Sequence, residues 1–387
     1  MRQLARHGVK RYRVAPIGTA PRSLSGGDTV DAVTAPPLPV PLAELTTLRV
    51  GGGARALVSC PDTGSLVAEV GRLDAAGEPT LLIGGGSNLV IADEGFDGTA
   101  VLIRSDSIEF GRESARPYVT ADAGVGWDDL VRITVDAGYG GLECLSGIPG
   151  AAGATPVQNV GAYGVEVADV LRSVRLLDRR TGSVRWVPPA ELDLGYRTSN
   201  LKYRNDFVVL AVSFWLTDGR LSQPLRYRDL WESLDVADGA RADAAAVRDH
   251  VLRVRRGKGM VLDPDDHDTW SAGSFFTNPV LPAEEATGVL TTIHRRVGND
   301  ISVPSYPGPD GVKLSAGWLI ERAGFSRGYP GPESPVRLST KHTLALTNRG
   351  GASTDEILDL ARTVRDGVRS AFGVSLHPEP VLVNCEL

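Results

Sequence analysis

The chain has 387 residues, with 42% hydrophobic and 23% charged side chains and a formal net charge of −6 at pH 7. This length predicts about two domains plus an appendage, and the composition is ordinary for a soluble globular protein. The acidic balance argues against nucleic acid as the main partner, because phosphate binding requires a basic surface. No apolar run approaches the ~18 residues of a membrane-spanning helix, so we expect no membrane insertion.

Cysteine and histidine spacing gives no sign of a metal site. Cys60, Cys144 and Cys385 are far apart and form no C-x-x-C pair, and the six histidines show no H-x-x-x-H spacing. Sparse cysteines are typical of proteins that stay in a reducing cytoplasm. We therefore expect a cytoplasmic protein without a bound metal, and we expect it to be a monomer.

Residues 1–40 differ in composition from the rest of the chain. They begin with a basic, acid-poor segment and continue into a Ser/Gly/Pro-rich stretch that ends in Pro36-Pro37-Leu38-Pro39. A secretory signal needs an apolar core of about 7–15 residues, which this segment lacks, although an Arg-rich start can resemble an organelle transit peptide. We expect a disordered extension, since little apolar surface is available for burial.

The first half of the chain predicts a mixed α/β arrangement with short strands. Strands are expected at 56–60, 80–83, 89–91, 100–103, 119–122, 169–177 and 207–216. Helices are expected at 65–73 and 127–137, the latter ended by Gly138.

The second half alternates loops and helices. A polar, aromatic loop is expected at 219–232, a helix at 244–256, and an extended segment at 374–384. Ser353 and Glu356 have the spacing of a capping box, and apolar residues then recur at helical spacing as far as Gly373. The acidic run 263–268 lacks the glycine and terminal glutamate of a calcium-binding loop, so it is interpreted as a solvated turn.

The stretch 147–164 contains the densest group of small residues in the chain. Its glycines stand at 147, 150, 153, 161 and 164, Pro149 and Pro156 stiffen it, and Gln158 and Asn159 add amide groups. Glycine is useful where the backbone needs a positive φ or where another group approaches closely. This pattern favours a backbone surface against a large, flat, polar ligand, and a plain surface loop is the alternative.

A second glycine-rich segment, Gly84-Gly85-Gly86-Ser87-Asn88, follows a predicted strand. Successive backbone N–H groups, with the Ser87 and Asn88 side chains, predict a cradle for an anion such as phosphate. The earlier segment 51–56 fits G-x-G-x-x-A, but a strand follows it where a dinucleotide-binding fingerprint needs a helix. We therefore reject a Rossmann site.

Two further motifs carry hydroxyl or amine groups. Ser274 lies between Gly273 and two phenylalanines, so it either delivers a proton in a dry pocket or satisfies a core turn. Residues 199–202 match S-x-x-K, but the companion motifs of a β-lactamase are absent.

These motifs together resemble the UDP-N-acetylenolpyruvoylglucosamine reductase (MurB) family, from about Thr46 to the end of the chain. The matching segments are 47–52, 84–89, 147–164, 195–197, 273–279, 313–321 and 377–380. The block 224–230 resembles the tyrosine-bearing loop of the longer family type. The resemblance implies an enzyme of peptidoglycan precursor synthesis, and thus of cell-wall biogenesis, cell shape and cell division.

The resemblance implies an α+β and α/β fold, in which two subdomains of the vanillyl-alcohol-oxidase type (the PCMH FAD-binding fold) hold non-covalent FAD. A C-terminal α/β domain then covers the substrate. The expected divisions are 1–40, an extension; 41–217, the FAD-binding domain; 218–373, the substrate domain; and 374–387, a strand that returns to the active site. NADPH is the implied co-substrate, and the enolpyruvyl sugar nucleotide is the substrate.

The resemblance also implies roles for individual residues. Arg197, Ser274 and Glu379 match the catalytic positions. The cofactor-binding positions are Gly84, Gly85, Gly86, Ser87, Asn88, Gly147, Ile148, Pro149, Gly150, Gly153, Gln158, Asn159 and Gly161. Those that match contacts to the sugar nucleotide or NADPH are Tyr163, Tyr196, Tyr227, Lys258 and Asn278.

Two other functions stay open from the sequence. An alcohol or sugar oxidase of the same flavin fold often tethers its flavin through histidine, and no histidine occurs between His7 and His250. A non-catalytic sugar-nucleotide sensor would keep the pocket, but binding alone does not need a proton donor such as Ser274.

Overall fold

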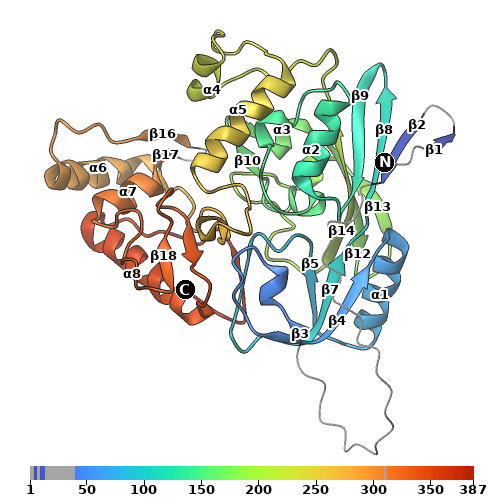
Figure 1. Ribbon diagram of the computed structural model, residues 1–387, viewed down its shortest axis with the longest axis horizontal. Helices are drawn as coiled ribbons and strands as arrows, with labels where there is room; N and C mark the ends of the chain where they lie inside the picture. The colour runs from blue at the N-terminus through green and yellow to red at the C-terminus, as the bar shows by residue number, and fades with distance from the viewer. Residues whose placement is uncertain (1–3, 7–8, 14–39, 309–310) are drawn as a thin grey trace, which may run out of the picture.

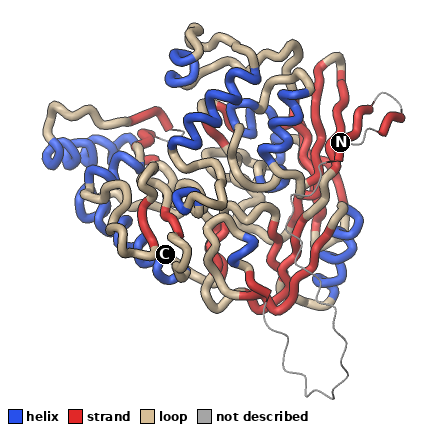
Figure 2. The backbone as a smooth tube through the Cα atoms, in the orientation of Figure 1, coloured by secondary structure: helices blue, strands red, loops and turns tan. Residues whose placement is uncertain are grey.

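The computed structural model describes residues 4–6, 9–13, 40–308 and 311–387. Strands gather on one side of the molecule, and most of the C-terminal helices lie on the other (Figures 1 and 2). No helix within these described ranges is long and apolar enough to cross a membrane.

A four-stranded sheet in the order β3-β4-β7-β5 forms the first layer. Its strands are β3 (Val40–Pro41), β4 (Gly53–Cys60), β5 (Thr80–Ile83) and β7 (Phe96–Ile103), and β4, β7 and β5 run parallel. Helix α1 (Thr63–Ala75) connects β4 to β5 and begins with a capping box at Asp62. Its buried face, at Leu66, Val70 and Leu73, packs against apolar residues of both sheets. The predicted strands and helix in this region are confirmed.

A seven-stranded antiparallel sheet in the order β1-β2-β8-β9-β14-β12-β13 forms the second layer. Its strands are β1 (Leu4–Arg6), β2 (Val9–Arg13), β8 (Ser107–Glu113), β9 (Arg116–Asp122), β12 (Leu171–Asp178), β13 (Val184–Val187) and β14 (Phe207–Trp215). Helix α2 (Trp127–Asp136) covers it, and the buried Trp127 and Phe214 rings meet edge to face at 5.4 Å. Residues Ile148, Val157 and Val160 pack against this core and also line the cavity described below.

The C-terminal part has its own apolar core, built around α8 (Thr354–Phe372). Ser353 and Glu356 form the predicted capping box, and Gly373 ends the helix at φ +74°. The other elements are β15 (Val280–Pro282), α6 (Ala283–Val297), β16 (Ser305–Gly308), β17 (Gly311–Leu314), α7 (Ala316–Arg322), β18 (Val336–Leu338) and β19 (Leu346–Asn348).

The two parts are joined by strands and by one helix. Strand β20 (Val381–Val383) pairs parallel with β6 (Leu89–Ile91), directly after the glycine-rich segment 84–88. Helix α5 (Ala244–Gly257) lies between α2 and the C-terminal part (Figure 1). The remaining short elements are β10 (Gly161–Ala162), β11 (Val165–Glu166), α3 (Val167–Val170) and α4 (Arg228–Ser233).

Several predictions of secondary structure need correction. Strands β8 and β13 and helix α6 were not expected. The segment that begins at 169 starts with the last turn of α3, and the predicted loop 219–232 contains α4. Helix α4 is short, and its sequence lacks the apolar repeat that would have indicated it.

The N-terminal extension is also partly ordered, contrary to expectation. Strand β2 pairs antiparallel with β8, and β1 pairs with β2. Residues 14–39 lie outside the described ranges. An edge strand such as β8 offers unpaired backbone groups to any extended segment, so this pairing does not require an apolar side-chain pattern.

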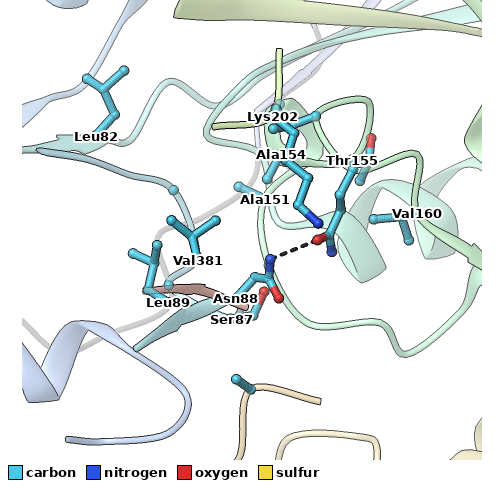
Figure 3. A pocket seen from close by; sticks show the side chains of 18 of the residues that line it. Leu82, Ser87, Asn88, Leu89, Ala151, Ala154, Thr155, Val160, Lys202 and Val381 are labelled. Carbon is cyan, nitrogen blue, oxygen red and sulfur yellow. Dashed lines mark hydrogen bonds between the residues drawn. The ribbon is translucent and has the colours of Figure 1, made fainter. Parts of the chain in front are cut away.

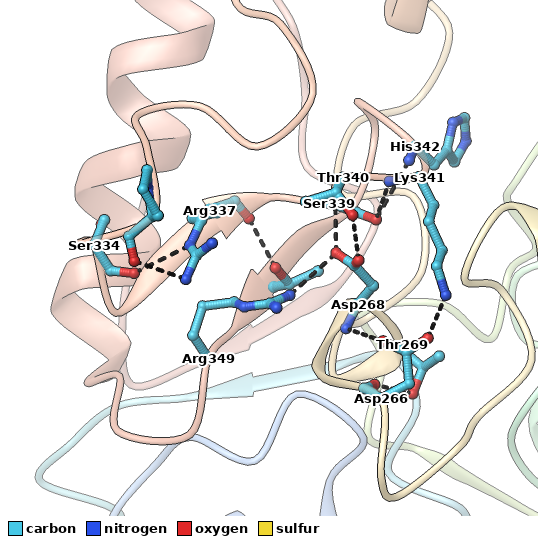
Figure 4. Close-up of polar contacts among 12 residues, drawn as sticks. Asp266, Asp268, Thr269, Ser334, Arg337, Ser339, Thr340, Lys341, His342 and Arg349 are labelled. Carbon is cyan, nitrogen blue, oxygen red and sulfur yellow. Dashed lines mark hydrogen bonds and ion pairs between the residues drawn. The ribbon is translucent and has the colours of Figure 1, made fainter.

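The acidic run 263–268 is not simply solvated. Asp268 is buried, accepts a hydrogen bond from the Thr340 backbone at 2.9 Å, and pairs with Arg349 at 3.1 Å (Figure 4). Asp266 pairs with Lys341 at 2.5 Å. The acidic side chains of this loop therefore attach it to residues 339–349 through hydrogen bonds and ion pairs.

Candidate active site

A cavity of about 690 Å³ opens where the two sheets meet the C-terminal part. Its walls come from residues within the segments 80–89, 148–161, 201–209, 272–274 and 379–384, together with Arg197 and Arg255. Most of the residues predicted to bind the cofactor, and all three predicted catalytic residues, lie on these walls. The sequence motifs thus converge on one space, although they are far apart along the chain.

The two glycine-rich segments pack directly against each other. A Cβ atom on Gly85 would lie 2.5 Å from the Gly150 Cα. The Ser87 hydroxyl donates to the Pro149 carbonyl at 3.0 Å, and the Asn88 amide donates to Gln158 Oε1 at 2.7 Å (Figure 3). The glycines are therefore needed for contact between the two loops, and not only for the approach of a ligand.

The backbone of the segment 84–88 is free to form the predicted anion cradle, whereas its side chains already make hydrogen bonds to the second loop. Within the described residues, no acceptor is found for the backbone N–H groups from Gly85 to Asn88. Successive free N–H groups form a concave site for an anion. The Ser87 and Asn88 side chains each donate one hydrogen bond to the second loop, and their predicted contact with an anion stays a prediction.

Arg197 and Glu379 meet in the cavity wall. Arg197 Nη2 donates to the Gly161 carbonyl at 2.7 Å, and Arg197 Nε lies 3.2 Å from Glu379 Oε1. The alignment at Nε does not make a hydrogen bond, so this buried donor is close to a carboxylate but has no hydrogen-bond partner among the described residues. Arg197 also holds a left-handed backbone, at φ +56°. Such a conformation costs free energy in a non-glycine residue and persists only where the surrounding structure enforces it.

The environment of Glu379 favours its neutral form. Burial raises the pKa of Glu379, and the charges of Arg197 and Lys202 only partly oppose this rise. A carboxyl group that is desolvated to this degree keeps its proton to higher pH than one in water. Glu379 is therefore suited to donate a hydrogen bond into the cavity.

Ser274 faces the cavity with a free hydroxyl. It is half-buried, it follows Gly273 at φ +74°, and within the described residues its side chain makes no hydrogen bond. A hydroxyl that only satisfied a core turn would have such a partner. The geometry does not support the core-turn alternative, and proton delivery stays the interpretation to be tested.

Two predicted cofactor residues do not line the cavity. Gly147 donates its N–H to Asp128 Oδ1 at 2.6 Å. The buried Asn159 side chain donates to Glu166 and to the Gly195 carbonyl, and it accepts from Ala168. Both residues therefore shape the loop from behind, because their polar groups are already used inside the protein.

None of the residues predicted to hold the sugar nucleotide or NADPH lines the cavity itself, although Tyr163 and Tyr196 lie close to the wall residues Arg255 and Arg197. The Tyr163 and Tyr227 rings meet edge to face at 5.3 Å. Tyr196 lies beside Arg197, and the ammonium group of Lys313 sits 4.8 Å from the Tyr196 ring centroid. Asn278 uses its Oδ1 to accept from the Ala316 N–H.

Lys258 belongs to a basic group at the end of α5. Burial lowers the pKa of His342 to about 4, and the charges of Lys258, Arg327 and Arg255 add to this effect. Of these groups, Arg255 also lies close to Tyr163, so its positive charge reaches one member of the tyrosine pair.

Sequence analysis missed two cationic residues of the cavity, Arg255 and Lys202. Arg255 Nη2 donates to the Met260 carbonyl at 2.7 Å, and its Nε has no partner in the described part of the chain. Burial lowers the pKa of Arg255, and the nearby Tyr163 hydroxyl counters this. The basic end of the predicted helix 244–256 was the only signal for Arg255, and the S-x-x-K segment was the signal for Lys202.

The cavity fits a large anionic cofactor. In the described part of the chain, free N–H groups line one wall, the Nε atoms of Arg197 and Arg255 lack hydrogen-bond partners, and apolar side chains such as Leu82, Leu89 and Val160 supply apolar contacts (Figure 3). A buried donor without a partner costs about 1–3 kcal/mol unless a ligand accepts from it.

Comparison with known proteins identifies the family. Residues 54–188 match the FAD binding domain, and residues 263–383 match the C-terminal domain of UDP-N-acetylenolpyruvoylglucosamine reductase. The UDP-N-acetylenolpyruvoylglucosamine reductase of Nocardia farcinica is 58% identical over 384 residues, which is 98% of each chain. The chain belongs to the UDP-N-acetylenolpyruvoylglucosamine reductase family. The Saccharopolyspora erythraea reductase is 59% identical over 348 residues, covering 89% of this chain and 95% of its own.

A solved structure of this reductase family supports the fold. The reductase from Thermus caldophilus superimposes with a TM-score of 0.58 at 24% identity, covering 88% of this chain and 97% of its own. The predicted fold class, an α+β FAD-binding part followed by the family's C-terminal domain, is confirmed.

The cavity also predicts how this reductase family member holds its flavin. Neither histidine nor cysteine occurs among the described residues that line the cavity, and Cys60 and Cys144 are buried elsewhere. Burial raises the pKa of Cys144, which keeps its thiol unreactive. We expect acid denaturation followed by filtration to release all yellow colour into the filtrate. Colour that stays with the polypeptide would contradict a non-covalent flavin.

Proposed function

We propose that this chain reduces UDP-N-acetylglucosamine enolpyruvate to UDP-N-acetylmuramate, with NADPH as reductant and FAD as the bound cofactor. The observation that carries this proposal is the convergence of Arg197, Glu379 and the free Ser274 hydroxyl on the glycine-lined cavity. We further propose that the protein acts as a cytoplasmic monomer in peptidoglycan precursor synthesis, and so contributes to cell shape and cell division.

Arg197 is suited to the substrate's carboxylate. FAD, when bound, supplies the hydride that adds to the alkene of the enolpyruvyl group. Negative charge then develops on the carbon beside the carboxylate and spreads onto the carboxylate oxygens. Arg197 Nε has no hydrogen-bond partner in the described residues, so it can donate to an oxygen that becomes more negative during the reaction. A guanidinium is always charged and presents its donors in a fixed fork.

Glu379 contributes as a neutral acid. An ionised Glu379 would repel the developing negative charge, whereas the protonated form donates a hydrogen bond to it. Burial raises the pKa of Glu379, which supports the protonated form at neutral pH. The charge of Arg197, whose Nε lies 3.2 Å from Glu379 Oε1, opposes this rise only in part.

Ser274 completes the reaction by protonating the carbon. Its hydroxyl lines the cavity and makes no hydrogen bond within the described residues, so it is available to the substrate. Serine is a weak acid in water, but in a water-poor site it can give its proton to a strongly basic carbon as that charge develops.

One spectrum tests the proposed function. The purified protein should be yellow, should lose its colour with NADPH, and should regain it when the enolpyruvyl sugar nucleotide is added without oxygen. A non-catalytic sensor would not lose colour with NADPH. An alcohol or sugar oxidase would lose its colour with its own alcohol substrate and recover it with oxygen, but it would not respond to the enolpyruvyl compound.

Tyr227 and Lys258 are expected to contribute to the affinity for the sugar nucleotide. Replacing Tyr227 by phenylalanine or Lys258 by methionine should raise KM for the sugar nucleotide about tenfold, because each removes a donor beside the expected diphosphate position. The rate at which NADPH reduces the flavin should change much less. Arg228→Met, which removes an exposed ion pair with Glu232 on the same loop, is the matched control. Unchanged KM values in both variants would place these residues outside the site.

A further inference from the structure

Lys202 is a buried cation that the proposed mechanism does not use. It ends the S-x-x-K segment, only 9% of its surface is exposed, and it lies in the wall of the cavity (Figure 3). Burial of an ammonium group is unfavourable unless hydrogen bonds compensate for the lost hydration. A buried lysine therefore requires specific hydrogen-bond acceptors for its ammonium group.

The contacts of Lys202 connect two catalytic residues. Its Nζ donates to the Arg197 carbonyl at 3.1 Å and to the Glu379 carbonyl at 3.5 Å. The Asn88 amide also approaches the Glu379 carbonyl, at 3.5 Å. The main-chain oxygens of the catalytic arginine and the catalytic glutamate thus share one ammonium group.

Both of these residues need external support. Arg197 has a left-handed backbone at φ +56°, which is unfavourable for a side chain with a Cβ atom. Glu379 lies in the segment just before β20, where its N–H donates to the Phe275 carbonyl at 2.9 Å. The first residue belongs to the FAD-binding part, and the second returns from the C-terminal part. Their separation of 3.2 Å therefore depends on how the two parts are held together.

We propose that Lys202 is a positioning residue that fixes Arg197 against Glu379, so that the guanidinium grips the substrate carboxylate. This inference rests on the proposed function. The ammonium group supplies three donors at one point, and it holds both carbonyls at once. Lys202 is not the proton donor, because its hydrogen bonds are directed at these main-chain oxygens.

Ligand binding separates positioning from general stability. UDP-N-acetylmuramate carries the lactyl carboxylate, whereas UDP-N-acetylglucosamine has a hydroxyl group in its place. In Lys202→Met, the Kd for UDP-N-acetylmuramate, measured by titration of the flavin absorbance, should rise about tenfold or more. The Kd for UDP-N-acetylglucosamine should stay within about twofold. Equal changes for the two ligands, or no change for either, would overturn the proposal.

The two half-reactions provide a second readout. A displacement of about 1 Å in a catalytic group can cost about 10²-fold in rate. Lys202→Met should therefore slow reoxidation by the enolpyruvyl substrate about 10²-fold, while reduction by NADPH stays near normal. Lys202→Arg keeps the charge and several donors, and it should recover part of the lost rate. Equal slowing of both half-reactions would indicate a merely structural lysine.

A matched control removes a different cation, the half-buried Arg179, which contacts the same loop. Arg179 pairs with Asp74 and donates to the Asn205 carbonyl at 3.2 Å, without contact to Arg197 or Glu379. Arg179→Met should lower the melting temperature but leave the ratio of the two Kd values unchanged. If the unsubstituted protein is not reoxidised by the enolpyruvyl compound, the proposed function itself fails. If it is reoxidised and Lys202→Met behaves like the control, only the inference about Lys202 fails.

Discussion

Replacing Ser274 by alanine should slow reoxidation by the enolpyruvyl substrate about 10²–10⁴-fold while NADPH still reduces the flavin at near-normal rate. Reduction by NADPH needs no proton from a serine, but the carbanion-like product of hydride addition must be quenched on carbon. The Ser274 hydroxyl has no hydrogen bond within the described residues, so its removal should leave the surrounding structure intact. Stopped-flow traces of the two half-reactions measure the difference directly.

A neighbouring serine provides the control for this variant. The Ser271 hydroxyl accepts a hydrogen bond from the Gly273 N–H at 3.2 Å and is buried. Ser271→Ala should cost about 1 kcal/mol of stability and affect both half-reactions equally. Ser274→Cys keeps a transferable proton and should recover part of the rate. If Ser274→Ala slowed both half-reactions to the same extent, the proton-donor role would have to be abandoned.

Replacing Glu379 by alanine should lower the rate of the second half-reaction about 10²–10³-fold, the usual cost of removing one donor that stabilises a developing negative charge. Glu379→Gln keeps a neutral donor at the same position and should retain more activity than alanine. FAD content should stay normal in both variants, because Glu379 contributes its side chain to the reacting end of the cavity.

The raised pKa of Glu379 also predicts the direction in which activity changes with pH. Burial raises the pKa of Glu379, and activity requires the protonated form. Activity should therefore be full below this raised pKa and should fall as the pH rises through it. In Glu379→Gln this alkaline decline should disappear, since the amide does not titrate. A decline that persists unchanged in the glutamine variant would assign the titration to another group.

Local sequence patterns predicted the parts of the fold that depend on neighbouring residues. The capping box at Ser353 and the strand at 80–83 are defined within a few residues, and both are found as expected. The glycine-rich segment 84–88 follows that strand and lines the cavity, as its composition indicated.

The features that sequence analysis missed depend on contacts between distant segments. Nothing near Lys202 in the sequence indicates that its ammonium group reaches the Glu379 carbonyl. Asn159 looked like a ligand-binding amide, yet Glu166 and the backbone of residues 168 and 195 use its polar atoms. The left-handed backbone of Arg197 could not be predicted either, because the composition of that segment does not require it.

The contact between Gly85 and Gly150 restricts how this site can change by mutation. A Cβ atom on either residue would overlap the other loop, at 2.5 Å for Gly85 and at 2.6 Å from the Ser87 hydroxyl for Gly150. In most packed pairs, an enlarged side chain can be accommodated when its neighbour becomes smaller. Between Gly85 and Gly150 this exchange is impossible, since neither residue has a side chain to lose. Second-site suppressors of a Gly85→Ala variant should therefore map to residues that shift a whole loop, such as Pro149, and not to Gly150.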